Sequence, residues 1–121
     1  MIEVKELNIK EIKLIKTKRF RDDRGFFQQN YNINDYIDAG IESKFIQDNW
    51  SRSKKGTLRG LHYQLKNPQS KLIQVICGEV YDVAVDMRIN SPTFGQWIGE
   101  YLSEENGHQL YIPKGFAHGF L

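Results

Sequence analysis

The chain has 121 residues, which is room for one domain with a single hydrophobic core and leaves no space for a second. Its 17 basic and 15 acidic residues give a formal charge of +2 and are spread along the sequence. A nucleic-acid-binding domain usually gathers its basic residues into one stripe, so the sequence argues against a nucleic-acid partner.

Cysteine content and hydropathy bear on the compartment. The single cysteine, Cys77, cannot form an intramolecular disulfide, which favours a reducing compartment. The N-terminus has no apolar run of signal-peptide length, and no stretch approaches the roughly 20 apolar residues that cross a bilayer. We therefore expect a cytoplasmic protein with no membrane partner.

The first predicted elements are short strands and one helix. Residues 7–18 mix β-branched residues with lysines and predict one or two strands, half exposed or at a sheet edge. Residues 23–25 read Asp-Arg-Gly and predict a turn into another strand. Residues 34–39 predict a short helix with Asn34 as its N-cap and Gly40 after its last turn. We expect at most one or two such helices in the whole chain.

From residue 44 onward, short strands follow one another, separated by polar or glycine-containing turns. The expected strands are residues 44–50, 56–64, 71–77, 80–88, 96–102, 109–112 and 116–121. A polar loop is expected at residues 65–70, and a two-residue turn at Gly78 and Glu79 makes the clearest hairpin. Many short strands with frequent turns predict an all-β, antiparallel barrel or sandwich.

The strand at residues 80–88 has two different faces. Its odd positions are apolar, whereas its even positions include Asp82, Asp86 and Arg88. The polar face either meets solvent or lines a wet cavity inside a barrel. Solvent is the commoner arrangement in antiparallel sheets.

The stretch 56–64 combines β-prone apolar residues with Arg59, Gly60 and His62. In a regular strand, Arg59 and His62 would point to opposite faces. A bulge at Gly60 would turn both toward one cavity, and bulges are common beside active sites. The competing interpretation is that His62 is a hydrogen-bonded structural residue.

Several polar side chains on predicted strands are candidate site residues: Arg24, Gln47, Asn49, Arg59, His62, Lys71, Asp82 and His118. Lys71 opens an apolar strand, where it is either a solvated charge or a functional group. His118 follows a Pro-x-Gly turn and is either a core histidine or a site residue. His108, in a polar turn, is expected at the surface.

Residues 113–118, Pro-Lys-Gly-Phe-Ala-His, resemble part of the cupin signature, Pro-x-Gly-x-x-His. Metal-binding cupins also present a His-x-His pair, and here that place reads His62-Tyr63-Gln64. Two imidazoles fall short of the three protein ligands that a catalytic metal usually needs. We therefore predict no metal and no cofactor.

Seven motifs in order resemble the dTDP-4-dehydrorhamnose 3,5-epimerase family, and they cover nearly the whole chain from Phe20 onward. They lie at residues 20–27, 45–49, 56–64, 71–72, 78–86, 91–95 and 112–120. The resemblance implies one cupin-like domain over residues 1–121, incomplete at its C-terminal end. Its implied fold is a jelly-roll β-barrel of antiparallel strands.

The resemblance also implies a reaction, the conversion of dTDP-4-dehydro-6-deoxy-D-glucose to dTDP-4-dehydro-L-rhamnose. The two carbons beside the ketone are inverted by removal and return of a proton. Such chemistry needs a base that titrates near neutral pH, a cation near the ketone oxygen and an acid on the opposite ring face.

Residue roles follow from the matched motifs. His62 matches the family's base, and Lys71 matches its lysine near the ketone oxygen. The positions that match substrate-binding residues are Phe20, Arg24, Gln29, Gln47, Asn49, Arg59 and His118. Among them, the two arginines would contact the diphosphate, where a guanidinium fork fits, and Phe20 would stack near the thymine. His118 would be paired with Asp82.

Two departures from the family pattern matter. Gln28-Gln29 stands where the family usually has a glutamate. The family's acid tyrosine and the aspartate that orients its base follow the last matched motif, and no residue of this chain matches them. We expect a homodimer that exchanges N-terminal strands. Three alternatives stay open: an epimerase acting at one carbon, a non-catalytic sugar-nucleotide-binding fragment and, with least support, a metal-dependent oxygenase.

Overall fold

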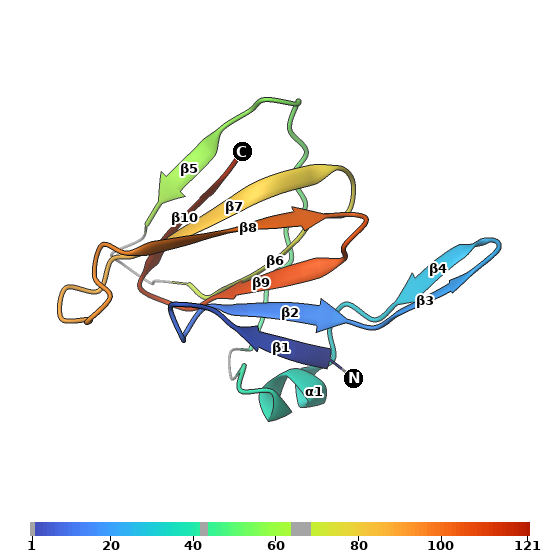
Figure 1. The fold of residues 1–121 in the computed structure, drawn as a ribbon, viewed down its shortest axis with the longest axis horizontal. Helices are drawn as coiled ribbons and strands as arrows, with labels where there is room; N and C mark the ends of the chain where they lie inside the picture. Colours follow the sequence, from blue (N-terminus) through green and yellow to red (C-terminus); the bar gives the residue numbers. More distant parts are fainter. Residues whose placement is uncertain (1, 42–43, 64–68) are drawn as a thin grey trace.

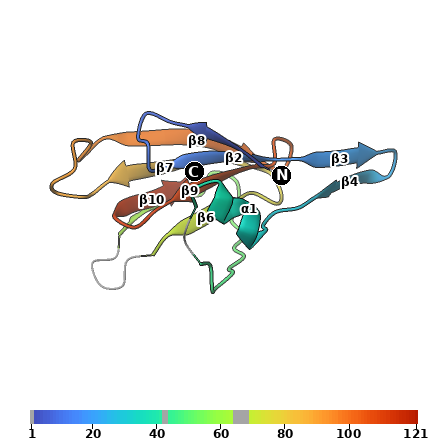
Figure 2. The same ribbon diagram turned by 90° about the horizontal axis from the view of Figure 1, so that it is seen from below.

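Two four-stranded antiparallel sheets dominate the computed structural model, which describes residues 2–41, 44–63 and 69–121 (Figures 1 and 2). The first sheet has the order β1-β2-β9-β6: β1 Ile2–Glu6, β2 Lys13–Thr17, β9 His108–Ile112 and β6 Lys71–Gln74. The second has the order β5-β10-β7-β8: β5 Arg59–His62, β10 Phe116–Phe120, β7 Glu79–Asp86 and β8 Trp97–Ser103. This nearly all-β, antiparallel fold confirms the predicted fold class.

The main core lies between the two sheets. Because side chains alternate along a strand, the strands that border this core meet it with one of their two faces. The buried side chains from the first sheet and the turn before β2 are Ile9, Ile12, Leu14, Leu110 and Ile112. Those from the second sheet are Ala84, Ile98, Leu102 and Phe116.

The face of β7 that points inward is the one that carries the acids. Asp82, Ala84 and Asp86 are fully buried, whereas Tyr81, Val83 and Val85 are only half-buried. Of the two alternatives left open by the sequence, the solvent-facing one is therefore excluded. The acids tolerate burial because each carboxylate has hydrogen-bond partners, described below.

A second, smaller core lies on the other side of the first sheet, under the helix α1 (Ile33–Asp38). It consists of Ile15, Tyr36, Ile41 and Tyr111. The N-cap is Asn32 and not Asn34, because the extended backbone of Asn32 (φ −141°) lets its side chain accept from the amides of Asn34 and Asp35.

Strand boundaries differ from the sequence prediction in several places. Of the strand expected at residues 56–64, β5 covers Arg59–His62, and residue 64 lies outside the described part of the chain. Residues 44–50 form no strand and run unpaired to β5, with Ile46 95% exposed. The strand expected at 71–77 ends at Gln74, and the strand β1 was not predicted. Of the loop expected at residues 65–70, residues 65–68 lie outside the described part of the chain.

The remaining two strands, β3 (Arg19–Asp22) and β4 (Gly25–Gln28), form a hairpin around the predicted turn at residues 23–25. The hairpin is a separate two-stranded sheet that extends away from the two large sheets in both views (Figures 1 and 2).

Candidate active site

A bulge in β5 places Arg59 and His62 on the same face of their sheet. Arg59 pairs with Phe120, and His62 pairs with His118, so Gly60 and Leu61 together lie opposite the single residue Gly119. Residues that pair directly across antiparallel strands share a face. The extra residue therefore cancels the alternation that would have separated Arg59 from His62, which confirms the predicted bulge at Gly60.

Two glycines make this bulge possible. Gly60 has a φ of +128°, and a Cβ there would lie 2.4 Å from the Cα of Gly119. A Cβ on Gly119 would lie 2.7 Å from the carbonyl oxygen of Arg59. The backbones of β5 and β10 thus approach more closely than any side chain at either position would allow.

The same face continues across the sheet into the buried interior. His118 pairs with Ala84 of β7, and Phe120 pairs with Asp82. Since Ala84 belongs to the core between the sheets, His118 and Asp82 face the same interior. His62, in contrast, is exposed, because β5 is the outermost strand on this side of the sheet.

His118 and Asp82 form a buried pair. The His118 Nε2 lies 2.7 Å from Asp82 Oδ1, and Asp82 has no exposed surface. The other carboxylate oxygen, Oδ2, is buried and has no hydrogen-bond partner among the described residues. Burial raises the pKa of Asp82, and the bond to His118 together with the charges of His118 and Lys71 opposes that rise. The pairing of His118 with Asp82 that the sequence suggested is present.

Lys71 faces this pair from the opposite sheet. It is the first residue of β6 and pairs with Ile112, a member of the core between the sheets. It therefore points into that interior, where its charge acts on Asp82. Lys71 is thus half-buried and inward-facing, and its functional role stays a prediction.

The segment before β5 holds three further polar groups. The Oγ of Ser53 accepts a hydrogen bond of 2.8 Å from the Nε of Arg59. Among the described residues, the two terminal nitrogens of that guanidinium have no partner. Gln47 donates to Asn49 at 3.2 Å, and both side chains are exposed. Ser53 was not among the predicted site residues, and nothing in its local sequence distinguishes it from its polar neighbours.

The other three predicted substrate contacts are not brought to this interior. Phe20 and Arg24 lie on the β3–β4 hairpin, and Gln29 directly follows it, on the side of the molecule away from β5 (Figure 1). Arg24 is held within the hairpin by Asp22, whose carboxylate lies 2.7 Å from its guanidinium. Within one chain, the predicted site is thus divided into two groups.

Sequence analysis did not single out the buried carboxylate of Asp86. It accepts hydrogen bonds from Arg88, Ser91 and Thr93, and Arg88 also pairs with Glu11 at 2.6 Å. These bonds lower the pKa of Asp86, the bond from Arg88 most strongly. The cluster fixes the loop at residues 87–96, which explains the Ser-Pro-Thr motif without assigning it to chemistry.

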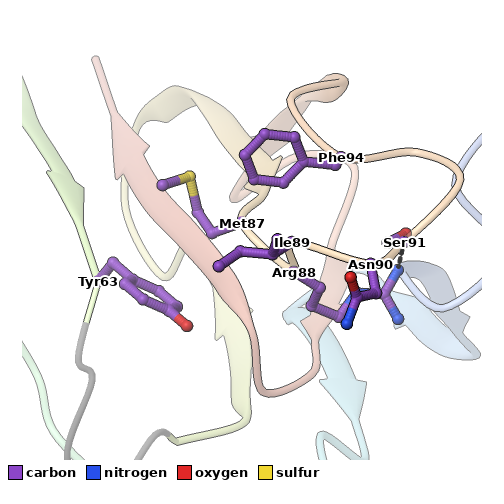
Figure 3. A pocket seen from close by; sticks show the side chains of 7 residues that line it. All are labelled: Tyr63, Met87, Arg88, Ile89, Asn90, Ser91 and Phe94. Atoms are coloured by element: carbon purple, nitrogen blue, oxygen red, sulfur yellow. Dashed lines mark hydrogen bonds between the residues drawn. The ribbon is translucent and has the colours of Figure 1, made fainter.

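This loop borders an open depression of about 830 Å³. Figure 3 shows Tyr63, which follows β5, on one side and Met87, Ile89 and Phe94 on the other. The lining includes none of the predicted site residues. We therefore place the candidate active site at the interior between the sheets, where Asp82 pairs with His118 and the charge of Lys71 acts on Asp82.

Lys71 acts on the His118–Asp82 pair, and His62 lies next to His118 on the same face of its sheet. This arrangement of a lysine and two histidines is suited to proton transfer beside a carbonyl group. Among the described residues, no group of three or more histidine, cysteine or acidic side chains is arranged to hold a metal ion. In the same ranges, no helix has the length and hydrophobicity needed to cross a bilayer.

Comparisons with known proteins agree with this chemistry. A family model described as dTDP-4-dehydrorhamnose 3,5-epimerase matches residues 6–121. The dTDP-4-dehydrorhamnose 3,5-epimerase of Pseudomonas aeruginosa is 54% identical over 116 residues, which are 95% of this chain and 64% of that protein.

Two solved structures are also similar. A dTDP-6-deoxy-D-glucose-3,5-epimerase from Legionella pneumophila, in complex with dTDP-4-keto-L-rhamnose, is 53% identical with a TM-score of 0.96. The match covers 99% of this chain and 64% of that one. A 3'-monoepimerase from Streptomyces bikiniensis, in complex with dTDP-quinovose, is 30% identical with a TM-score of 0.88, and the match covers 96% of this chain and 60% of that one. This chain thus spans less than two thirds of the length of these relatives.

Proposed function

Because the chain belongs to the dTDP-4-dehydrorhamnose 3,5-epimerase family, we propose that it serves the inversion of the two carbons beside the ketone of dTDP-4-dehydro-6-deoxy-D-glucose. The product is dTDP-4-dehydro-L-rhamnose, the precursor of dTDP-L-rhamnose. The observation that carries the proposal is the bulge in β5, which turns Arg59 and His62 to the face that His118 and Asp82 share.

The chemistry assigns roles to His62, Lys71, Asp82 and His118. The acid that returns a proton to the opposite ring face is a further group, because no residue of this chain matches the family's tyrosine. His62 is the base that removes a proton from the carbon beside the ketone, because an imidazole ordinarily titrates near neutral pH. The electron pair released by the broken C–H bond moves to the ketone oxygen and forms an enolate. Lys71 stabilises that oxygen as a point charge. Asp82 holds His118 in one orientation in the interior between the sheets.

The nucleotide would be held by groups with free donors. Ser53 occupies only the Nε of Arg59, so the terminal nitrogens of Arg59 can bind a diphosphate in a bidentate manner. Gln47 and Asn49 are exposed beside this segment and would contact the nucleotide.

Phe20, Arg24 and Gln29 would complete the site from a second copy of the chain. Their hairpin lies too far from β5 to serve its own interior, and it exposes Phe20, Phe26 and Phe27. Monomeric proteins rarely expose such clusters. We therefore propose a homodimer. Since β1 pairs with β2 of the same chain, the predicted exchange of N-terminal strands stays a prediction.

The reaction is tested by proton NMR of dTDP-4-dehydro-6-deoxy-D-glucose incubated with the chain in deuterium oxide. We expect deuterium at both carbons beside the ketone, with inversion. His62→Ala should abolish the exchange, and Lys71→Met should slow it by about 100-fold, a loss typical of removing one oxyanion-stabilising group. Binding of dTDP without any exchange would leave a sugar-nucleotide-binding protein in place of an enzyme.

Inversion at one carbon is the second candidate, favoured by the similarity to a 3'-monoepimerase. The same NMR experiment separates the two, because deuterium would then enter at a single position. The absence of a metal requirement is tested alongside, by repeating the exchange in the presence of a chelator.

The dimer is tested by complementation between two variants, His62→Ala, which lacks the base, and Arg24→Ala, which should bind the nucleotide weakly, co-expressed with different affinity tags and assayed at substrate concentrations below the wild-type KM. If the hairpin serves the partner's site, a mixed dimer contains one site with both His62 and Arg24 intact. We expect such dimers to regain about half of the wild-type rate. A mixed dimer that stays inactive would show that each hairpin serves its own chain.

A further inference from the structure

The base of the β3–β4 hairpin is tied to the body by a small set of polar contacts. The Nε of Arg19 donates to Oε1 of Gln28 across the hairpin at 2.7 Å. From this pair, Arg19 NH1 donates to the carbonyl of Glu105 at 3.0 Å, and Gln28 Nε2 donates to the carbonyl of Gly107 at 3.2 Å. Both acceptors belong to the turn between β8 and β9.

These contacts matter because the hairpin has little else to hold it. Residues 20–27 are all exposed, and only Arg19 and Gln28 are half-buried. A two-stranded hairpin is marginally stable in water without further packing. In the described part of the chain, every hydrogen bond from a hairpin side chain to the two large sheets and their turns comes from Arg19 or Gln28.

The turn that receives the contacts is itself rigid. Asn106 Oδ1 accepts from the amides of Ser103 and His108, and Asn106 Nδ2 donates to the carbonyl of Tyr101. Gly107 has a φ of +61°, and a Cβ there would lie 2.6 Å from Arg19 NH2 and 2.8 Å from Gln28 Oε1. The turn thus leaves the space in which the two side chains sit.

Arg19 also fixes the hairpin internally. Its Cζ lies 3.9 Å from the centroid of the Phe26 ring, a cation–π contact with the opposite strand. One guanidinium therefore links three parts of the chain: β3, β4 and the β8–β9 turn.

We propose that Arg19 and Gln28 are positioning residues, which fix the direction of the β3–β4 hairpin relative to the sheets and thereby the placement of Phe20 and Arg24 on a nucleotide bound to a second copy of the chain. The inference rests on the proposed role of the hairpin in substrate binding. Neither residue touches the substrate. Their effect is on how often the hairpin is in the binding orientation, so their loss should weaken binding and leave the chemical step unchanged.

The experiment compares Arg19→Gln and Gln28→Leu with Arg21→Gln in the dimer. Arg21 is a matched control, because it lies on the same strand, two residues from Arg19, is exposed, and faces the same Phe26 ring at 5.7 Å without reaching the turn. The first measurement is hydrogen–deuterium exchange of the hairpin amides by mass spectrometry. We call the contacts of Arg19 and Gln28 with the β8–β9 turn the brace. We expect about 10-fold faster exchange of the hairpin amides in the two brace variants, Arg19→Gln and Gln28→Leu, than in the control, with the exchange of β7 and β9 unchanged.

The second measurement is the affinity for dTDP by calorimetry, together with KM and kcat for the dTDP-4-keto sugar. Both brace variants should bind dTDP about 5- to 10-fold more weakly and show an equally raised KM, with kcat within about 2-fold of wild type. Arg21→Gln should change either constant by less than about 2-fold. Light scattering establishes that all variants are equally dimeric.

Each result decides one point. Unchanged hairpin exchange in Arg19→Gln and Gln28→Leu would overturn the brace, whatever the substrate does. Faster exchange with unchanged dTDP affinity would overturn the positioning role, provided that Arg24→Ala does weaken dTDP binding. If Arg24→Ala has no effect on dTDP binding, the proposed role of the hairpin fails, and the positioning role fails with it.

Discussion

The close approach of β5 and β10 predicts that alanine substitutions at three glycines lower the free energy of unfolding by different amounts. Gly78→Ala introduces backbone strain alone, since φ is +85° and nothing lies within 4 Å of the added Cβ. Gly119→Ala introduces a clash alone, with a Cβ 2.7 Å from the Arg59 carbonyl. Gly60→Ala introduces both, with φ at +128° and a Cβ 2.4 Å from the Gly119 Cα.

The magnitudes follow from these geometries. A left-handed φ costs an alanine about 1 kcal/mol net of its lower unfolded-state entropy. Relieving the clash at Gly119 requires β5 to move by about 0.7 Å, which stretches its hydrogen bonds to β10 beyond the usual range and costs about 2 kcal/mol. We therefore expect losses of about 1, 2 and 4 kcal/mol for Gly78→Ala, Gly119→Ala and Gly60→Ala.

Urea unfolding followed by circular dichroism measures these losses. With a slope of about 1.5 kcal/mol per molar urea, Gly119→Ala lowers the midpoint by about 1.3 M. The same displacement moves His62, so the deuterium exchange of the substrate should fall by about 10- to 100-fold at urea-free conditions. A Gly119→Ala protein as stable as Gly78→Ala would refute the reasoning, because it would mean that β5 is not seated against β10.

Two further predictions concern the buried acids. The raised pKa of Asp82 means that the folded state binds its proton more tightly than the unfolded state, so this contribution to stability is present below pH 3.8 and is lost as pH rises through the folded pKa. Asp82→Asn removes the charge and should leave the free energy of unfolding at pH 7 equal to or above that of wild type, while slowing deuterium exchange of the substrate. A loss of more than about 1 kcal/mol in urea unfolding would contradict this. The lowered pKa of Asp86 has the opposite sign, with stability present above pH 3.8 and lost as pH falls through the folded pKa. Asp86→Ala should cost about 3 kcal/mol at pH 7, because Arg88 loses a buried partner, and should flatten the acid limb of the stability profile; an unchanged limb in acid titration of the variant would count against it.

Local chemistry made part of the site predictable. A glycine between an arginine and a histidine in a strand has few explanations other than a bulge, and the structure contains that bulge. The hairpin turn at residues 23–25 is likewise encoded by its own residues. In both cases, the signal and its structural outcome lie within a few positions of each other.

Features that depend on distant partners were not predictable. The alternation of apolar and polar residues along β7 does not tell which of its faces is buried. The hydrogen-bond partners of Asp82 and Asp86 decide this, because they allow the acidic face to be the buried one. Residues 44–50 have a strand-like composition but pair with no strand among the described residues. The brace between Arg19 and the β8–β9 turn joins residues 86 positions apart, and no local sequence pattern predicts it.

The edge position of β5 has a consequence for the stability of the proposed site. In the described part of the chain, β5 is hydrogen-bonded to β10 and to no other strand, and all four of its residues are exposed. Such a strand belongs to the low-stability end of a protein's range of local openings, whereas the strands around the buried core open only with global unfolding. Arg59 and His62 would therefore detach together, as one unit, while the sandwich that holds Lys71 and His118 stays folded. We expect the proposed activity to be lost reversibly under mild heat or denaturant, by fraying of this strand before the sandwich unfolds.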